Sequence, residues 1–425
     1  MGREKMSPCT ELTINSFFAG IGGFDIGFEN SGFKTSFLCE INPFCNDVLT
    51  AHWPNVKRAT DICKVNPLEI PDATVWCGGF PCQDISVARG ASERLGLHGQ
   101  RSGLFYQYAD LIELKHPEGV ILENVAGLFN SNGGRDFGVI LQRMMSMGYA
   151  VAWRLVNSRY FGVPQSRTRV YICCWKANPM KAMLSLFDRN NAPLPNERKA
   201  FVTPSATGRE YPIVPQVAYC LAATSGRHTG TDWSRTYVVC KDGVRRMTPV
   251  EYERLQGFPD DWTTAGSTSL GVDEIDTLRY TAIGNAVSVP VVEWLAKRIK
   301  EVLPLQIRTL KYKNEIKSYV SQFSKEDWHA TGFENINFGD TSVHYTWPNS
   351  GIAYKGSYIG AKVPPTPHVI IDSLLGDIVE TEGVSRRYYL TPNAAEGILR
   401  RVDHQKRTLF APLRAALEKE KNKQQ

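Results

Sequence analysis

Apolar runs alternate with glycine-marked turns and helical patterns through the first 175 residues of the chain. Residues 12–18 and 119–123 have the composition of buried strands, whereas residues 43–52 and 104–114 repeat apolar side chains at helical spacing. Strands that alternate with helices in this way are typical of a sheet covered by helices on both faces. The sequence therefore predicts an α/β fold with a doubly wound sheet.

The composition is that of an ordinary globular protein. Hydrophobic residues make up 42% and charged residues 22% of the 425 residues, which excludes wholesale disorder. Apolar runs stay below the roughly 18 residues of a membrane span. Residues 1–13 lack the apolar core of a signal peptide, so we expect a cytoplasmic protein without a membrane partner. A net charge of +6 permits a polyanionic partner without requiring one.

A glycine-rich turn, F-F-A-G-I-G-G at residues 17–23, follows the first predicted strand and opens a helix. Its glycines let the backbone approach a ligand closely. Glu40, at the end of the next strand, is placed to accept hydrogen bonds from ribose hydroxyls, and Asp61 and Ile62 are placed to contact a base. Such a turn also serves in packing and in dinucleotide enzymes. Here Asp25 breaks the dinucleotide fingerprint, and no phosphate-binding lysine suggests ATP.

Cys82 stands at the carboxyl end of another predicted strand, in the run C-G-G-F-P-C-Q of residues 77–83. Open α/β sheets bind ligands at that edge, so Cys82 is a candidate nucleophile if its surroundings favour the thiolate. The alternative is a small buried hydrophobic side chain, which is the expectation for most of the ten cysteines. They form neither a C-x-x-C pair nor an array with histidine, so no metal site is expected.

Glu123 ends a later strand and therefore lies at the same sheet edge as Cys82. A carboxylic acid there can protonate a heterocycle nitrogen, and the alternative is a solvated loop acid. Arg167 and Arg169, in Q-S-R-T-R at residues 165–169, share one face of the strand they begin. They can orient Glu123 or bind a base oxygen or a phosphate, and the alternative is an exposed basic pair.

Taken together, these motifs resemble those of the DNA (cytosine-5)-methyltransferase family, and their order and spacing agree over residues 12–300. Six matches in order are far more specific than any one of them. The matching motifs are F-x-G-x-G-G at 18–23, P-C-Q at 81–83, E-N-V at 123–125, Q-x-R-x-R at 165–169, R-L-Q-G-F-P at 254–259 and G-N-A-V at 284–287.

The resemblance implies a reaction and the residues that perform it. Cys82 would add to C6 of a flipped-out cytosine while Glu123 holds or protonates N3. Arg167 and Arg169 would support Glu123 and the base. The methyl donor S-adenosyl-L-methionine would lie against Phe18, Gly20, Ile21, Gly22, Gly23, Glu40, Ile41, Asp61, Ile62, Phe80, Pro81, Leu104, Asn285, Ala286 and Val287. DNA would be contacted by Gln83, Ser86, Arg89, Arg101, Arg227, His228 and Arg235.

The resemblance also divides the chain. We expect a catalytic and cofactor-binding domain at 1–176, a target-recognition region at 177–245, late motifs returning to the catalytic domain at 246–302 and a C-terminal accessory region at 303–425. In the accessory region, one basic amphipathic helix is expected near residues 393–417, touching DNA phosphates or forming a solvated face. Cys220 and Leu221 depart from the Thr-Leu pair that usually marks the recognition region.

The leading hypothesis is a monomeric, sequence-specific methyltransferase of double-stranded DNA in a bacterial or phage-infected cell. A cognate restriction endonuclease would be its partner in a restriction–modification system. A tRNA cytosine methyltransferase on the same core is the alternative, and the long recognition segment and tail favour DNA. A DNA-binding regulator without catalysis is a third hypothesis. The presence of Cys82, Glu123 and both arginines argues against it.

Overall fold

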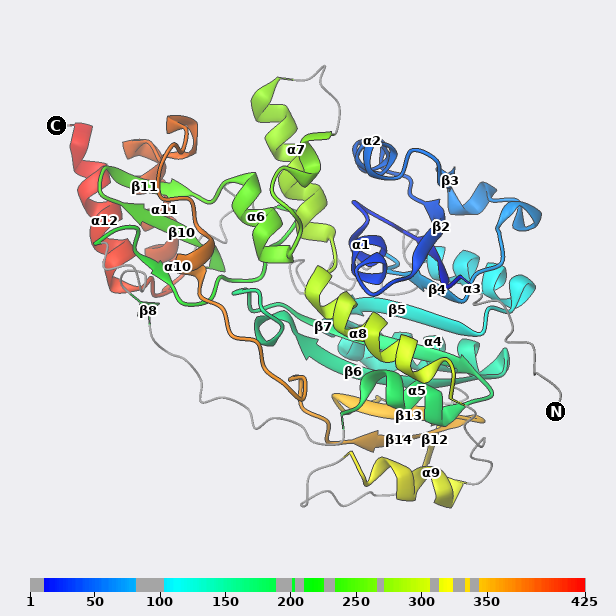
Figure 1. The fold of residues 1–425 in the computed structure, drawn as a ribbon. Helices are drawn as coiled ribbons and strands as arrows, with labels where there is room; N and C mark the ends of the chain where they lie inside the picture. The colour runs from blue at the N-terminus through cyan, green and yellow to red at the C-terminus, as the bar shows by residue number, and fades with distance from the viewer. Residues whose placement is uncertain are drawn as a thin grey trace, which may run out of the picture.

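The computed structural model is organised around one ten-stranded sheet (Figure 1). It describes residues 11–81, 103–188, 201–202, 210–224, 234–265, 271–305, 313–323, 333–336 and 344–424. In spatial order the strands are β12 (Glu334–Asn335), β14 (Ser357–Ala361), β13 (Ser350–Tyr354), β6 (Tyr149–Asn157), β7 (Thr168–Lys176), β5 (Gly119–Val125), β4 (Val75–Gly78), β1 (Thr13–Phe17), β2 (Lys34–Cys39) and β3 (Lys57–Ala59).

The half of the sheet from β5 to β3 is parallel. The chain runs outward from β1 to β2 and β3, then returns to build β4 and β5 on the other side of β1. The order of strands therefore reverses between β1 and β4, which is where open α/β sheets form a ligand crevice at the carboxyl ends of their strands. The predicted α/β doubly wound sheet is confirmed.

The other half, from β7 to β12, is antiparallel, and of its strands only β7, which begins at the Q-x-R-x-R motif, was predicted from the sequence. β6 and β7 are joined only by residues 158–167, which hold a single 3-10 turn, Ser158–Tyr160. Since a parallel pair needs a crossover of a dozen or more residues, usually helical, this short connection makes the pair antiparallel. The C-terminal region then adds β13 to the edge of β6.

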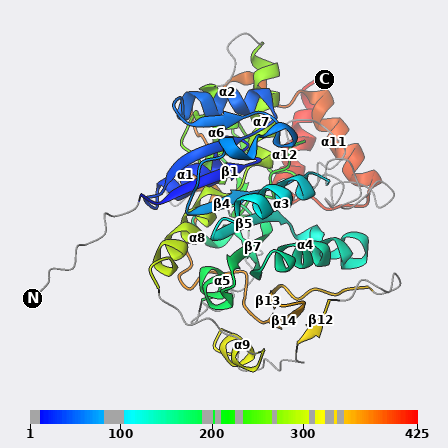
Figure 2. The ribbon, with the colours of Figure 1, turned by 90° about the vertical axis from the view of Figure 1, so that its right-hand side faces the viewer.

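Helices cover both faces of the sheet, as Figure 2 shows. One face packs against α1 (Gly23–Glu29), α5 (Pro179–Leu186) and α8 (Val289–Val302). The opposite face packs against α3 (Leu104–Lys115) and α4 (Arg135–Ser146). At Gly27 a β-carbon would come within 2.7 Å of the Val292 side chain, so this glycine allows α1 and α8 to approach closely.

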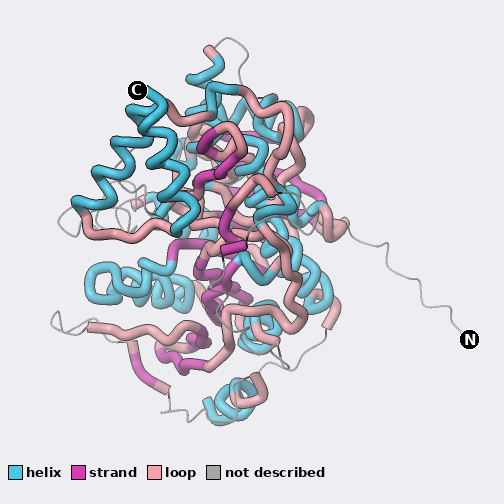
Figure 3. The backbone as a smooth tube through the Cα atoms, turned by 90° about the vertical axis from the view of Figure 1, so that its left-hand side faces the viewer, coloured by secondary structure: helices cyan, strands magenta, loops and turns pink. Residues whose placement is uncertain are grey.

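A second, smaller body lies beside the sheet (Figure 3). It consists of the hairpin β10 (Tyr237–Cys240) and β11 (Gly243–Arg246) covered by α11 (Pro392–His404) and α12 (Ala411–Lys421), and we call these four elements the small body. The prediction of one helix near 393–417 is wrong, because Lys406 adopts a left-handed conformation (φ 51°) that ends α11. The described part of the 303–425 region is thus shared between the sheet and the small body.

The remaining helices and strands complete the described structure. They are α2 (Pro43–His52), β8 (Phe201–Val202), β9 (Val214–Pro215), α6 (Pro249–Gln256), α7 (Val272–Asn285), α9 (Lys313–Val320) and α10 (Leu375–Ile378). α6 begins with a capping box in which Thr248 and Glu251 satisfy each other's backbone N–H groups. In the described part of the chain, no helix combines the length and apolar character that crossing a membrane requires.

Candidate active site

Three of the predicted segments meet at the carboxyl edge of the parallel strands. The last residue of β1, Phe17, lies opposite Gly78 of β4, and Gly78 lies opposite Leu122 of β5. The residues that follow these positions, namely the turn at 18–23, the segment 79–81 and Glu123, therefore lie at one edge. Several predicted residues fall outside the described part of the chain: Cys82, Gln83, Ser86, Arg89, Arg101, Arg227 and His228.

Glu123 is buried at this edge, with 8% of its surface exposed. Its carboxylate is 3.2 Å from Nε of Arg169. Loss of water on burial raises the pKa of Glu123, and the charges of Arg169 and then Arg167 oppose that rise. A β-carbon at residue 79 would approach the carboxylate to 3.2 Å, so Gly79 gives the acid room. The segment leading to Cys82 therefore passes directly beside Glu123.

The two arginines of the Q-x-R-x-R motif point to different partners. Arg169 forms the ion pair with Glu123, whereas Arg167 is 3% exposed and donates to backbone carbonyls. Its guanidinium reaches the oxygens of Leu221 (2.9 Å) and Ala286 (2.7 Å). Arg167 thus joins the segment at Leu221 to the G-N-A-V motif at 284–287, a role that its position in the sequence did not reveal.

Gln165 was predicted only as part of the motif, and it works alongside Arg167. It is fully buried, accepts a hydrogen bond from the backbone of Leu221 (2.9 Å) and donates to the carbonyl of Leu255 (2.9 Å). A buried amide that hydrogen-bonds to two backbone groups holds their segments in one arrangement. The path of residues 218–221 past Glu123 is therefore fixed from both sides.

Cys220 is an exposed residue whose sulfur lies within 3.7 Å of Nη1 of Arg167 and 3.9 Å of both terminal nitrogens of Arg169. Loss of water around the thiol works to raise its pKa, but the charges and N–H groups of the two arginines prevail, and the pKa of Cys220 is lowered. The sequence marked this position only as a departure from Thr. Its neighbours became apparent only in three dimensions.

The glycine turn leaves open space beside a fixed carboxylate. Gly20 has a φ of +57°, and a β-carbon there would meet no atom within 4 Å. Its N–H donates to Oε2 of Glu40 (2.8 Å), while the N–H of Asn42 donates to Oε1 (2.8 Å). The carboxylate of Glu40 is therefore held at the turn. Each of its oxygens keeps a further lone pair that can accept a ligand hydroxyl.

The last family motif packs directly onto this turn. A β-carbon at Gly23 would come within 2.7 Å of the Val287 side chain, so only glycine allows that contact without a shift. At Gly22 a β-carbon would come within 2.4 Å of Trp53. Asn285 ends α7 and is exposed beside these residues, while Ala286 is buried. Segments far apart in sequence thus form one wall.

The other predicted cofactor residues line the same strand ends. Ile41 follows Glu40 and is 69% exposed, which is unusual for an apolar side chain and leaves it available for a flat ligand. Asp61 accepts a hydrogen bond from the backbone of Cys63, and this bond lowers the pKa of Asp61. The residues Ile62 and Phe80 are buried, whereas Phe18, Ile21, Pro81 and Leu104 range from buried to half-buried.

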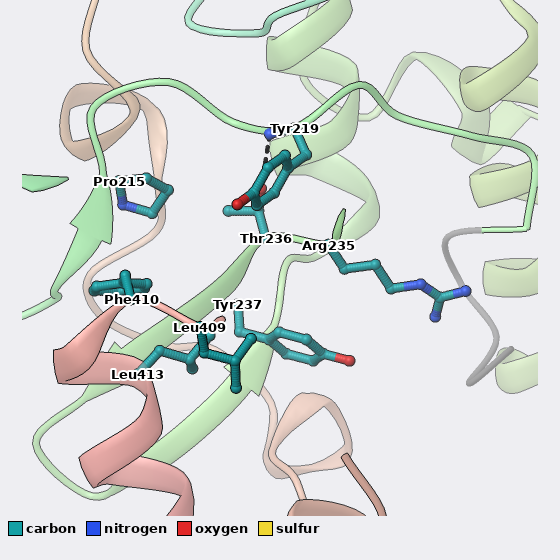
Figure 4. A pocket seen from close by; sticks show the side chains of 8 residues that line it. All are labelled: Pro215, Tyr219, Arg235, Thr236, Tyr237, Leu409, Phe410 and Leu413. Atoms are coloured by element: carbon teal, nitrogen blue, oxygen red, sulfur yellow. Dashed lines mark hydrogen bonds between the residues drawn. The ribbon is translucent and has the colours of Figure 1, made fainter. Parts of the chain in front are cut away.

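A pocket lies where residues 215–219 and 235–237 meet residues 409–413 (Figure 4). Tyr219 is on one side of it, and Leu409 and Leu413 are on the other. Arg235, the one predicted recognition residue in the described part of the chain, also borders it and donates to the carbonyl of Thr224 (3.0 Å). Among the described residues, no group of three or more His, Cys, Asp or Glu side chains could hold a metal ion.

Comparison with known proteins shows the family to which this chain belongs. The family model for C-5 cytosine-specific DNA methylases matches residues 12–205 and 196–301, so the chain belongs to that family of enzymes. It is 31% identical to Type II methyltransferase M2.BsuMI of Bacillus subtilis over 313 residues, covering 68% of this chain and 76% of the relative. It is 32% identical to Type II methyltransferase M.NgoBI of Neisseria gonorrhoeae over 317 residues, covering 68% and 92% respectively.

A solved structure shares the fold. The Entamoeba histolytica methyltransferase EhMeth aligns with a TM-score of 0.51 at 18% identity, covering 69% of this chain and 99% of that one. The family match ends at residue 301, before β12, β13, β14, α11 and α12. These later elements are therefore additions to the family core in this chain.

Proposed function

We propose that this enzyme methylates C5 of cytosine at a specific sequence in double-stranded DNA, through a covalent bond between Cys82 and C6 of a flipped-out base. The observation that carries the proposal is the buried Glu123, paired with Arg169 and lying against Gly79, three residues before Cys82. Three residues of chain span at most roughly 10 Å. Nucleophile and acid can therefore act on the two sides of one pyrimidine ring.

Cytosine C5 is a poor nucleophile until the ring loses its aromaticity. The Cys82 thiolate forms a bond to C6, and N3 takes a proton from Glu123, so electron density moves to C5. The raised pKa of Glu123 supports this step, because the carboxyl must carry the proton that it donates. Once C5 carries the methyl group that the donor would supply, leaving the donor as a neutral thioether, loss of the C5 proton to solvent and return of the N3 proton to Glu123 expel Cys82 as a thiolate and restore the ring.

S-adenosyl-L-methionine supplies, when bound, a sulfonium methyl group that carbon nucleophiles attack. The open space at Gly20 and the fixed carboxylate of Glu40 fit this group, because ribose hydroxyls can donate to that carboxylate. Ile41 would lie against its base, and Asp61 and Ile62 would border it. The rest of the predicted cofactor-binding residues, including Asn285 and Val287, would contact the cofactor from the other side of the glycine turn.

Neither the attack of Cys82 on C6 nor the methyl transfer to C5 can occur while the base is stacked in the duplex. The target cytosine must therefore flip out of the duplex, at a cost of a few kcal/mol. Phosphate contacts and the predicted loop residues Gln83, Ser86, Arg89 and Arg101 would offset that cost. Arg227, His228 and Arg235 would read the sequence. Single alanine variants of these three, assayed on a library of sites, should change site preference.

Partners and location extend the proposal. The two relatives are named Type II methyltransferases, which favours a restriction–modification system with a cognate endonuclease as partner. We expect a monomer acting in the cytoplasm of a bacterial or phage-infected cell. Size measurement of the purified protein with and without DNA would test the monomer.

The decisive experiment measures transfer of a labelled methyl group from S-adenosyl-L-methionine to duplex DNA and, separately, to tRNA. We expect label in duplex DNA only, recovered as 5-methylcytosine, and no transfer by Cys82→Ala. Label in tRNA alone would assign the alternative substrate. No transfer to either would favour a regulator without catalysis. Bisulfite sequencing of DNA from expressing cells would then give the target sequence.

A further inference from the structure

The positive charge of the chain is concentrated at its C-terminal end. Residues 386–425 contain ten lysines and arginines but only four aspartates and glutamates. That surplus equals the +6 net charge of the whole protein, so the preceding residues are neutral on balance. A local surplus of this size on one structural unit creates a field that attracts polyanions.

The charged segment is built into the small body as half of its core. Val239 and Val244 of the β10–β11 hairpin pack against Ile398, Val402, Leu413 and Leu417 of α11 and α12, all of them buried. Without the two helices, the hairpin would expose its apolar face. The C-terminal helices and the β10–β11 hairpin therefore share one hydrophobic core.

Polar contacts fix the same arrangement. The N–H of Leu390 donates to the carbonyl of Val244 (2.8 Å), and Nζ of Lys423 donates to the carbonyl of Asp242 (2.9 Å). On the side facing α7, the hydroxyl of Tyr388 donates to Asp276 (2.8 Å). The tail is thus tied both to the hairpin and to the element that carries the last family motif.

The turn between α11 and α12 reaches toward the candidate active site. Leu409 and Phe410 border the pocket of Figure 4 together with Tyr219. Tyr219 precedes Cys220, whose sulfur touches Arg169, the partner of Glu123. Figure 2 also shows α11 on the same side of the molecule as α4. The basic helix therefore stands near the edge where the substrate must enter.

On α11 and the turn that follows it, two cations are available to a ligand. Arg400 on α11 and Lys406 in the turn are exposed, and within the described residues neither pairs with a carboxylate. By contrast, Arg414 binds Asp403 (2.9 Å) and Glu418 (3.1 Å), so its charge is already compensated.

We infer that α11 and the turn that follows it form a DNA-backbone contact surface of the recognition region, with Arg400 and Lys406 binding phosphates of the duplex. This inference rests on the proposed function, since it takes the partner to be double-stranded DNA. It gives the C-terminal helices, which lie beyond the family match, a part in substrate binding. The contact would be independent of sequence, because phosphates carry no base information.

The test compares the full-length double variant Arg400→Gln/Lys406→Gln with the control Lys176→Gln/Lys355→Gln. Lys176 and Lys355 are also exposed but lie near the opposite edge of the sheet, where β7 ends and β13 turns into β14. The measurement is the affinity for a random-sequence duplex over a range of salt concentrations. Each lost phosphate contact lowers the slope of log affinity against log salt by about 0.9.

We expect the Arg400/Lys406 variant to lose about 1.8 from that slope and the control to keep the wild-type slope, with cofactor affinity and melting temperature unchanged in both. An unchanged slope in the Arg400/Lys406 variant, or an equal loss in the control, would contradict the inference that Arg400 and Lys406 bind phosphates. Binding of tRNA in preference to duplex would overturn the partner. If wild-type protein shows the salt-dependent contact but transfers no methyl group to DNA, the proposed function fails while the surface stands.

Discussion

In the parallel half of the central sheet, strands and the helices that cover them follow one another along the chain. In the small body, the β10–β11 hairpin is covered by α11 and α12, which come only after β12, β13 and β14 have joined the far edge of the sheet. The first arrangement arises from local patterns, and the second arises from contacts between distant segments. The proposed catalytic residues lie in the first region, and the proposed DNA surface lies in the second.

Buried charged groups occur in both bodies and differ in how they are paired. At the junction with the small body, Arg245 and Glu251 are fully buried and form an ion pair, with 2.7 Å between Nη2 of Arg245 and Oε1 of Glu251. Within the sheet body, Asp25 is fully buried, and its second carboxylate oxygen has no hydrogen-bond partner in the described structure. A buried charge without a full set of partners shifts its proton equilibrium. We therefore expect Asp25 to make the stability of the sheet body depend on pH.

The largest effect should follow from Glu123→Gln in the sheet body. The change keeps the side-chain volume but removes the transferable proton, so we expect kcat to fall by about 10²–10⁴-fold with DNA and cofactor affinities nearly retained. Single-turnover methyl transfer measures this. Glu113→Gln, on the exposed side of α3, is the control. Wild-type turnover in the Glu123 variant would remove the acid from the reaction.

Leu417→Ala should lower the stability of the small body without lowering that of the sheet body. Leu417 is fully buried between α12 and the hairpin, and its truncation should cost about 2–5 kcal/mol. Hydrogen exchange should speed up in β10 and β11 but not in β5. Leu114→Ala, at a side chain 65% exposed, should change neither. Equal acceleration in β5 would show that the bodies unfold as one.

The unpaired acid of the sheet body should make stability depend on pH. Burial, with a smaller contribution from Glu29, raises the pKa of Asp25 from 3.8 to about 7. Between these values the folded protein holds a proton that the unfolded chain has lost, so stability should fall as the pH rises from about 4 to about 7. Asp25→Asn should flatten that slope in unfolding measurements at pH 5 and pH 8. An identical slope in the variant would assign the dependence elsewhere.

The smallest effect concerns two exposed thiols. The neighbouring arginines lower the pKa of Cys220, whereas burial and then Asp61 raise the pKa of Cys63. Near neutral pH, Cys220 should therefore react several-fold faster with iodoacetamide, and the difference should vanish at high pH where both are thiolates. Peptide mass spectrometry reads both rates. Equal rates at neutral pH would mean that Arg167 and Arg169 do not stabilise the Cys220 thiolate.

Local sequence predicted much of the sheet body. The helical spacing of residues 43–52 predicted α2 with the bounds it has, and that of residues 104–114 predicted α3 to within one residue. The apolar run of residues 119–123 predicted β5, although the strand continues two residues past Glu123, to Val125. These features depend on periodicity and on turn chemistry, which a short window of sequence contains.

What could not be predicted depends on distant partners. β6 was missed, and the 393–417 pattern was read as one helix because its apolar positions continue across the break at Lys406. Alternation placed Arg167 and Arg169 on one face, but only the fold shows that one meets Glu123 and the other meets carbonyls from residues 221 and 286. Side chains that serve long-range contacts carry no local signature.

The central claim is the covalent attack of Cys82 on a base extruded from DNA. The most direct measurement uses a duplex in which the target cytosine carries fluorine at C5, incubated with the enzyme and S-adenosyl-L-methionine. Since fluorine cannot leave C5 as a proton does, the adduct cannot resolve. We predict a denaturation-resistant complex with the DNA attached at Cys82 and none with Cys82→Ala. Methylation of ordinary cytosine by a protein that forms no such complex would contradict the account.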